Sequence, residues 1–161
     1  MTIANFDRLP VNKKEDLLKK CCGSSAWVSK MLDVFPVNDL IDLLEYADDT
    51  WEKCERKDWI EAFWEDPIAP DTQSLTEKYA ADEHSGTNLV SAQLQDSLAE
   101  SIKLYVQKFG YPFIGFAFRK SEGEMLTLLL GRLNNTPESE IKVAAAEQIQ
   151  IVKSRLKKIF I

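Results

Sequence analysis

The stretch YVQKFGYPFIGFAFRK, Tyr105–Lys120, is the longest apolar run in the chain and decides how the rest is arranged. Gly110 and Pro112 interrupt the run, so its second half is not expected to be helical. A buried backbone outside a helix must find other partners for its N–H and C=O groups. Two interpretations therefore stay open. The segment is either a hydrophobic crossover that fills the core, or the wall of a pocket whose backbone groups face a small polar ligand.

Helical patterns flank this run on both sides. Before it, apolar residues at helical spacing predict a helix that ends at Gly110. After it, an S-x-x-E sequence beginning at Ser121 predicts a helix start, and Thr136 followed by Pro137 predicts the start of a long last helix. The N-terminal part predicts four shorter helices, which begin at Asn12, at Ser24 or Ser25, at Asn38 and at Asp58.

These patterns predict an all-α fold. We expect a single domain over residues 1–161, a bundle of seven to nine helices around the central non-helical apolar segment. The sequence contains no internal repeat and no linker that would separate two domains. The residues expected to be mostly buried are Phe113, Phe116, Leu126, Leu130, Val152 and Leu156.

Composition limits the possible functions. The chain has 161 residues, 45% hydrophobic and 29% charged, with a formal net charge of −6. This negative charge argues against binding to nucleic acid or to an anionic membrane. No stretch is long enough to span a membrane, and the N-terminus lacks the pattern of a signal peptide. A cytoplasmic protein is therefore expected.

The cysteines do not suggest a metal site or a disulfide framework. Cys21, Cys22 and Cys54 have no C-x-x-C spacing, and His84 is the single histidine of the chain. A zinc site would lack ligands, and no histidine follows closely enough in sequence to activate a thiol. We expect Cys21 and Cys22 to be small buried residues and no metal to be bound.

Several separated motifs occur in one order along the chain, and together they resemble the 2-oxo-4-hydroxy-4-carboxy-5-ureidoimidazoline (OHCU) decarboxylase family. The resemblance covers roughly Phe6–Ile161. Its motifs are CCGSSAW at Cys21–Trp27, FWEDP at Phe63–Pro67, DEHSG at Asp82–Gly86, the central run, GRLNN at Gly131–Asn135, and E-x(7)-RL at Glu147–Leu156.

The resemblance implies an all-α, usually dimeric enzyme that needs neither a metal nor an organic cofactor. Such an enzyme removes the carboxylate of OHCU, a small anionic ureidoimidazoline of the urate degradation route, and yields (S)-allantoin. The expected partners are this substrate and a second copy of the chain.

The resemblance also implies a set of site residues. Glu83 matches the family's catalytic glutamate, Asp66 stands where the family has a histidine, and His84 stands where it has a glutamine. We therefore expect acid–base chemistry from these three residues, with the proton role at His84 because a histidine of ordinary pKa needs little tuning near neutral pH. The expected substrate-binding residues are Arg132, Phe113, Ile114, Gly115, Pro67, and Arg119, which stands where a glycine is expected.

The chemistry of decarboxylation gives these residues roles. Without a cofactor, the substrate's own ring must delocalise the negative charge, and the protein must orient the carboxylate, exclude water and deliver one proton. Arg132 suits the carboxylate because a guanidinium is always charged and offers parallel donors. At a helix end, however, an arginine can also be a surface residue that compensates the helix dipole.

Because the departures from the family fall on the catalytic positions, two other functions stay open. The chain is either a working decarboxylase, or an altered or inactive relative that binds a small anionic ureide or purine-derived ligand, or a helical interaction module with a vestigial pocket. An assay with OHCU separates these hypotheses.

Overall fold

The computed structural model describes residues 1–66, 89–115 and 122–160. Within these ranges every regular element is an α-helix, eight in all, and no strand occurs there. The all-α prediction is confirmed. By its contacts the chain divides into two compact units, Met1–Asp66 with Ala145–Ile161, and Pro67–Ala144. The single domain expected from the sequence stays a prediction.

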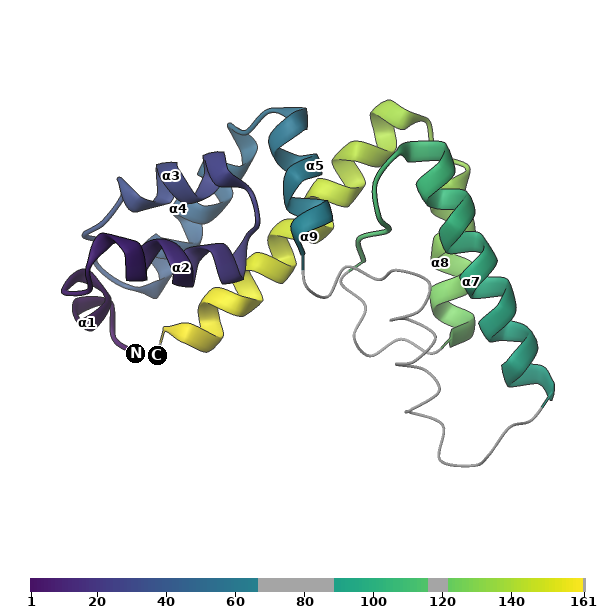
Figure 1. Cartoon of the computed structure of the whole chain (residues 1–161), viewed down its shortest axis with the longest axis horizontal. Helices are drawn as coiled ribbons and strands as arrows, with labels where there is room; N and C mark the ends of the chain where they lie inside the picture. The colour runs from purple at the N-terminus through teal and green to yellow at the C-terminus, as the bar shows by residue number, and fades with distance from the viewer. Residues whose placement is uncertain (67–88, 116–121, 161) are drawn as a thin grey trace. The chain divides into compact units, whose positions relative to one another are not determined.

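The first unit is built around helix α3, Ser25–Leu32, which packs against three other helices. Trp27 and Met31 of α3 are completely buried, and the Trp27 indole Nε1 donates a hydrogen bond to the Ala47 carbonyl at 3.2 Å. The helices of this unit are α1 Ile3–Asp7, α2 Val11–Cys21, α3, α4 Leu40–Glu52, α5 Arg56–Glu65 and the later part of α9 Pro137–Ile159 (Figure 1).

Residues 145–159 of α9 are anchored in the first unit by side-chain contacts with α4 and with the N-terminus. The Trp51 Nε1 donates to the Ala145 carbonyl at 2.9 Å, and the Lys153 ammonium lies 3.0 Å from a carboxylate oxygen of Asp48. The N-terminal amine of Met1 donates to the Ile159 carbonyl at 3.0 Å, and the two ends of the chain lie close together (Figure 1).

The helix starts in this unit show where local sequence rules succeed. Ser24 caps α3 by accepting from the Trp27 N–H, as predicted. The predicted start of α4 is wrong by one residue, because the Asp39 carboxylate and not Asn38 accepts the first free N–H.

Two other predicted starts are too late. Helix α2 begins at Val11, directly after Pro10, and not at Asn12. Helix α5 begins at Arg56, where Glu55 is the N-cap and Asp58, the third residue of the helix, completes the capping box and is not the cap itself. In both cases the helix begins before the polar residue that was predicted to start it.

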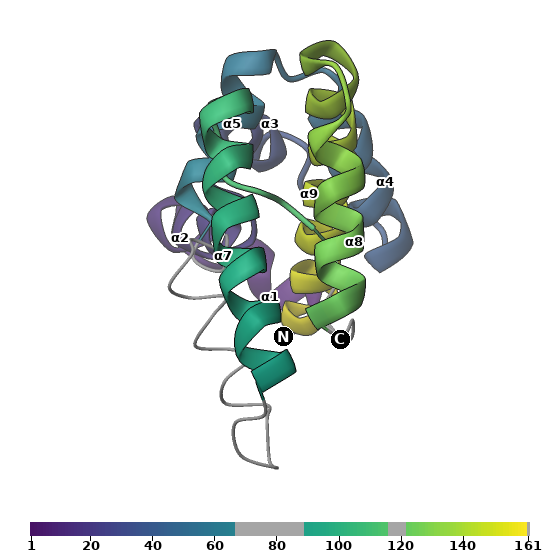
Figure 2. The same cartoon turned by 90° about the vertical axis from the view of Figure 1, so that its right-hand side faces the viewer.

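The second unit contains α7, Leu89–Phe109, α8, Glu122–Leu133, and the first residues of α9. Helices α7 and α8 lie side by side in both views (Figures 1 and 2). Gly110 ends α7 as predicted, with a φ of 83° and its N–H bonded to the Val106 carbonyl. Residues 111–115 then continue without helical structure.

The predicted core is partly correct. Phe113, Val152 and Leu156 are completely buried, Leu126 is half-buried, and Phe116 lies outside the described residues. The prediction for Leu130 is wrong, because 47% of this residue is exposed. The buried stripe of α8 instead contains Met125, Leu129 and Arg132, so Leu130 lies on another side of the helix.

No helix in residues 1–66, 89–115 or 122–160 combines the length and the apolar character that crossing a membrane requires.

Candidate functional site

Arg132 lies in the last turn of α8, and its guanidinium is buried, with only 4% of the residue exposed. Nε donates to Oε1 of Glu140 at 2.7 Å, and Nη2 lies 2.6 Å from the same oxygen. Nη1 donates to the backbone carbonyl of Ile114 at 2.5 Å. The arginine therefore joins α8 to the central non-helical segment and to the first turn of α9, and it is not a surface residue.

The Glu140 carboxylate is completely buried and is bonded on both oxygens. Besides the arginine, the Tyr105 hydroxyl donates to Oε1 at 2.6 Å, and the Asn135 amide donates to Oε2 at 2.9 Å. Burial raises the pKa of Tyr105 far above its usual range, and the hydrogen bond to Glu140 adds to this effect. Tyr105 therefore stays protonated and acts as a donor.

Aromatic rings enclose the guanidinium. Its central carbon lies 4.4 Å from the Phe113 ring centroid and 5.8 Å from the Tyr105 ring centroid. A Cβ at Gly115 would lie 3.8 Å from Nη1 of Arg132 and 3.0 Å from the Phe113 ring. The backbone of the central segment thus lies beside the cation, and a side chain at Gly115 would crowd the Phe113 ring.

Four of the predicted site residues come together here, namely Arg132, Phe113, Ile114 and Gly115. In the described part of the chain, Nη1 of Arg132 has the Ile114 carbonyl as its single partner, so its second N–H can serve an anion. The predicted residues Glu83, His84, Pro67 and Arg119 lie outside the described residues, and their positions stay predictions.

Asp66 belongs to the first unit, where it is the C-cap of α5 and is 7% exposed. Its Oδ1 lies 2.7 Å from Nη2 of Arg155, and its Oδ2 accepts from the Gln148 amide at 2.8 Å. Arg155 also donates through Nη1 to the Cys21 carbonyl at 3.1 Å. The carboxylate predicted to be catalytic thus connects α5, α9 and the end of α2. This gives Asp66 a structural role, whatever its part in catalysis.

Sequence reasoning missed two residues that complete the Arg132 cluster. From the sequence alone, Glu140 is an acidic residue in the first turn of the predicted last helix, and Tyr105 belongs to the apolar run. The spacing between Arg132 and Glu140 is the sequence feature that could have indicated their ion pair. Thr136 and Pro137 begin a new helix between them, so the chain turns back and opposite charges can meet across the turn.

The CCGSSAW motif has a structural explanation. A Cβ at Gly23 would lie 2.5 Å from the Cβ of Glu65, so only glycine lets the start of α3 pack closely against the end of α5. Cys21 and Cys22 are completely buried, and burial raises the pKa of the Cys21 thiol to about 11 and that of Cys22 further. Thiols with such pKa values are unsuited to nucleophilic catalysis.

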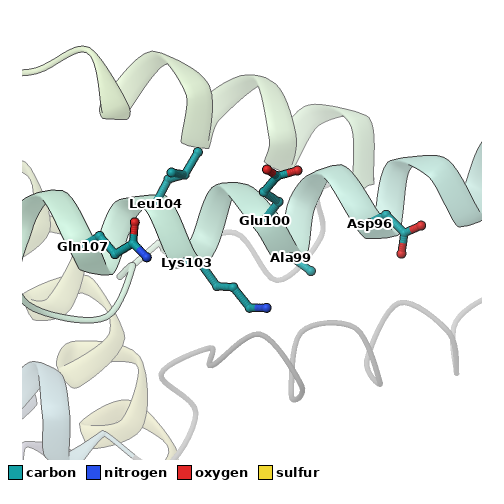
Figure 3. Close-up of a pocket in the computed structure, with 6 residues that line it drawn as sticks. All are labelled: Asp96, Ala99, Glu100, Lys103, Leu104 and Gln107. Atoms are coloured by element: carbon teal, nitrogen blue, oxygen red, sulfur yellow. The ribbon is translucent and has the colours of Figure 1, made fainter.

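Among the described residues, the lining of a pocket on α7 includes none of the predicted site residues (Figure 3). Its described lining comes from this one helix and mixes charged with apolar side chains, namely Asp96, Ala99, Glu100, Lys103, Leu104 and Gln107. In the described ranges no three His, Cys, Asp or Glu side chains gather closely enough to hold a metal ion.

Comparison with known proteins agrees with the family resemblance seen in the sequence. The family model for OHCU decarboxylase matches residues 7–157. The chain belongs to the OHCU decarboxylase family. This family match extends over both units of the chain.

Two proteins are similar to this chain over most of its length. The uric acid degradation bifunctional protein TTL of Arabidopsis thaliana is 32% identical over 152 residues, which cover 91% of this chain and 47% of that protein. The chain thus spans about half the length of this relative. A crystal structure of OHCU decarboxylase in the presence of (S)-allantoin is also 32% identical, with a TM-score of 0.73 over 88% of this chain and 95% of that one.

A crystal structure of (S)-allantoin synthase matches with a TM-score of 0.75 at 18% identity, over 99% of this chain and 54% of that one. At this identity the similarity concerns the fold alone.

Proposed function

We propose that this protein decarboxylates OHCU to (S)-allantoin without a cofactor. The single observation that carries the proposal is the contact between Arg132 and the Ile114 carbonyl in a chain of the OHCU decarboxylase family. This contact places a permanent cation against the backbone segment that the sequence predicted to be the pocket wall. A cation beside such a wall suits a substrate that carries both a carboxylate and ring polar groups.

In this proposal Arg132 binds the substrate carboxylate through the second N–H of Nη1. The backbone of Phe113, Ile114 and Gly115 faces the ring, where an N–H donor stabilises the negative charge that develops when CO₂ leaves. The aromatic rings around the guanidinium keep water away, which strengthens both interactions. Pro67 and Arg119 are proposed to complete the binding surface.

The proton that replaces CO₂ must come from an acid near neutral pH. We assign this role to His84, with Glu83 and Asp66 as the residues that orient it or the substrate. Asp66 is the weakest member of the set, because its carboxylate already binds Arg155 and Gln148.

One observation favours a second candidate, an altered relative that binds a small anionic ureide or purine-derived ligand without converting OHCU. Asp66 occupies the position where the family resemblance places a histidine, and its carboxylate is held in a buried ion pair. Its two oxygens accept hydrogen bonds from Arg155 and Gln148, which ties Asp66 to the packing of the first unit. If His84 does not replace the missing histidine, binding would persist without turnover.

We also propose a homodimer of single-domain subunits in the cytoplasm. The family resemblance supports the dimer and the single domain, and the composition supports the location. Analytical ultracentrifugation at micromolar concentration tests the dimer directly.

The test of the function is an assay with freshly generated OHCU. Circular dichroism follows the formation of optically active allantoin, and the expected result is formation faster than the spontaneous decay of OHCU. Arg132→Lys serves as the matched control, since it keeps the charge and loses the planar guanidinium whose Nη1 faces the substrate in this proposal. No acceleration by the wild-type protein, together with saturable binding of an OHCU analogue, would support the altered relative instead.

A further inference from the structure

Glu140 is a completely buried carboxylate that the proposed chemistry does not use. Four donors converge on it, two from the Arg132 guanidinium, one from the Tyr105 hydroxyl and one from the Asn135 amide. These donors come from α7, from α8 and from the turn before α9. A buried carboxylate bonded by so many groups has a fixed position, because moving it would break several hydrogen bonds in a site of low polarity.

The contacts of Glu140 determine how the guanidinium is oriented. A guanidinium is planar, and here Nε and Nη2, which form one edge, both bind Oε1 of Glu140. The remaining nitrogen, Nη1, must then point away from Glu140, and it meets the Ile114 carbonyl. The Phe113 ring, 4.4 Å from the central carbon, restrains the plane from one side.

We infer that Glu140 is a positioning residue, whose carboxylate holds the Arg132 guanidinium with Nη1 directed at the central segment and so at the substrate carboxylate. The part of this inference that concerns the substrate carboxylate rests on the proposed function. Tyr105 and Asn135 act in turn on Glu140, because their hydrogen bonds fix the carboxylate on both of its oxygens.

The test compares Glu140→Gln with Glu138→Gln. The first variant keeps the size of the buried side chain and removes its charge, whereas the second removes the same charge from an exposed residue of the same helix. For the substrate we expect Glu140→Gln to raise KM for OHCU at least ten-fold with a smaller change in kcat, and Glu138→Gln to change neither. In an Arg132→Lys background, adding Glu140→Gln should raise KM by less than two-fold, since the oriented group is already lost.

A second measurement does not depend on activity. The side-chain Nε–H of Arg132 is identified in a ¹H–¹⁵N spectrum as the signal that Arg132→Lys removes. In the wild type we expect slow exchange of this proton with water, because it is buried and bonded to Glu140. Glu140→Gln should speed the exchange at least ten-fold, and Glu138→Gln should leave it unchanged.

Tyr105→Phe provides a milder variant if Glu140→Gln does not fold. It removes one donor from the carboxylate and keeps the ion pair, so we expect faster Nε–H exchange and a rise in KM of about three-fold.

Unchanged KM and unchanged Nε–H exchange in a folded Glu140→Gln protein would overturn the inference. A lower melting temperature with wild-type KM would also overturn it, because Glu140 would then only stabilise the fold. If the wild type does not convert OHCU, the proposed function fails by itself, and the exchange of the Arg132 Nε–H alone decides whether Glu140 positions this side chain.

Discussion

Oδ1 of Asp66 lies 2.7 Å from Nη2 of Arg155, and the two side chains are 1% and 16% exposed. Asp66, which the sequence resemblance places where the family has a histidine, is thus one half of a buried ion pair. A histidine there would need different partners, because two cationic or donor groups already face this position. The identity of residue 66 therefore affects the packing of α5 against α9.

Arg155→Met is expected to lower the free energy of unfolding by about 3–5 kcal/mol, because it leaves the Asp66 carboxylate buried without its cation. Urea unfolding followed by tryptophan fluorescence measures the change. Arg56→Met is the matched control, since Arg56 is exposed at the start of α5 and should change stability by less than about 0.5 kcal/mol. If the two substitutions lowered the free energy of unfolding equally, the buried pair would contribute no more to stability than an exposed arginine does.

Gly23→Ala and Gly131→Ala should shift stability in opposite directions. At Gly23 the new methyl group would lie 2.5 Å from the Cβ of Glu65, and overpacking of this kind costs about 1–3 kcal/mol. Gly131 lies inside α8 with open space around it, so alanine there should add about 0.5–1 kcal/mol by its better helix propensity. Thermal unfolding of both variants gives the comparison, and a neutral Gly23→Ala would contradict the close packing.

Gly110→Ala tests the end of α7. The φ of 83° at Gly110 lies in the left-handed region, where a residue with a Cβ is disfavoured by about 1–2 kcal/mol. No heavy atom lies within 4 Å of the added methyl group, so the cost should come from the backbone alone. Gly110→Asn should then recover part of the lost melting temperature, since asparagine adopts this conformation more readily than alanine. Equal losses for the two variants would argue against this explanation.

The helix pattern could be predicted because its signals are local. Ser24 and Thr136 cap their helices as expected, since each cap involves an N–H only three residues away. The caps of α2, α4 and α5 were misplaced by one to three residues, because several polar or proline residues in a row could serve as the start.

The candidate site could be predicted only in part. The family motifs identified Arg132 and the central segment, but not the residues that hold them. Glu140 is eight residues from Arg132 and 35 from Tyr105, and Gln148 is 82 residues from Asp66. Such pairings follow from how the helices pack, and no periodicity in the sequence determines them.

The three cysteines should react slowly with thiol reagents in the folded protein. Burial raises the pKa of Cys21 to about 11 and raises those of Cys22 and Cys54 as well, so little thiolate exists at pH 8. We expect Ellman's reagent to label less than one thiol per native chain within minutes and all three after denaturation in guanidinium. Raising the pH from 8 to 9 should increase the native rate, because the reactive thiolate fraction of a thiol with a raised pKa still grows in this range. Rapid labelling of the native chain at pH 8 would contradict the burial of these thiols.

The last prediction separates the acid–base roles of His84 and Asp66. If His84 supplies the proton, His84→Ala should lower kcat for OHCU by about 10²-fold or more, the usual contribution of a positioned general acid. The melting temperature should stay nearly unchanged, because a proton donor has to be reached by the substrate and contributes little to packing.

Asp66→Asn should behave in the opposite way. It keeps the shape of the side chain and loses the charge that pairs with Arg155, so the melting temperature should fall by several degrees while kcat changes less than for His84→Ala. A His84→Ala enzyme with wild-type kcat, beside an Asp66→Asn enzyme of normal stability and low kcat, would transfer the proton role to Asp66. The contacts of Asp66 argue against that second result, because its Oδ1 already accepts from Arg155 and its Oδ2 from Gln148, and a carboxylate held in this way serves the packing of α5 against α9.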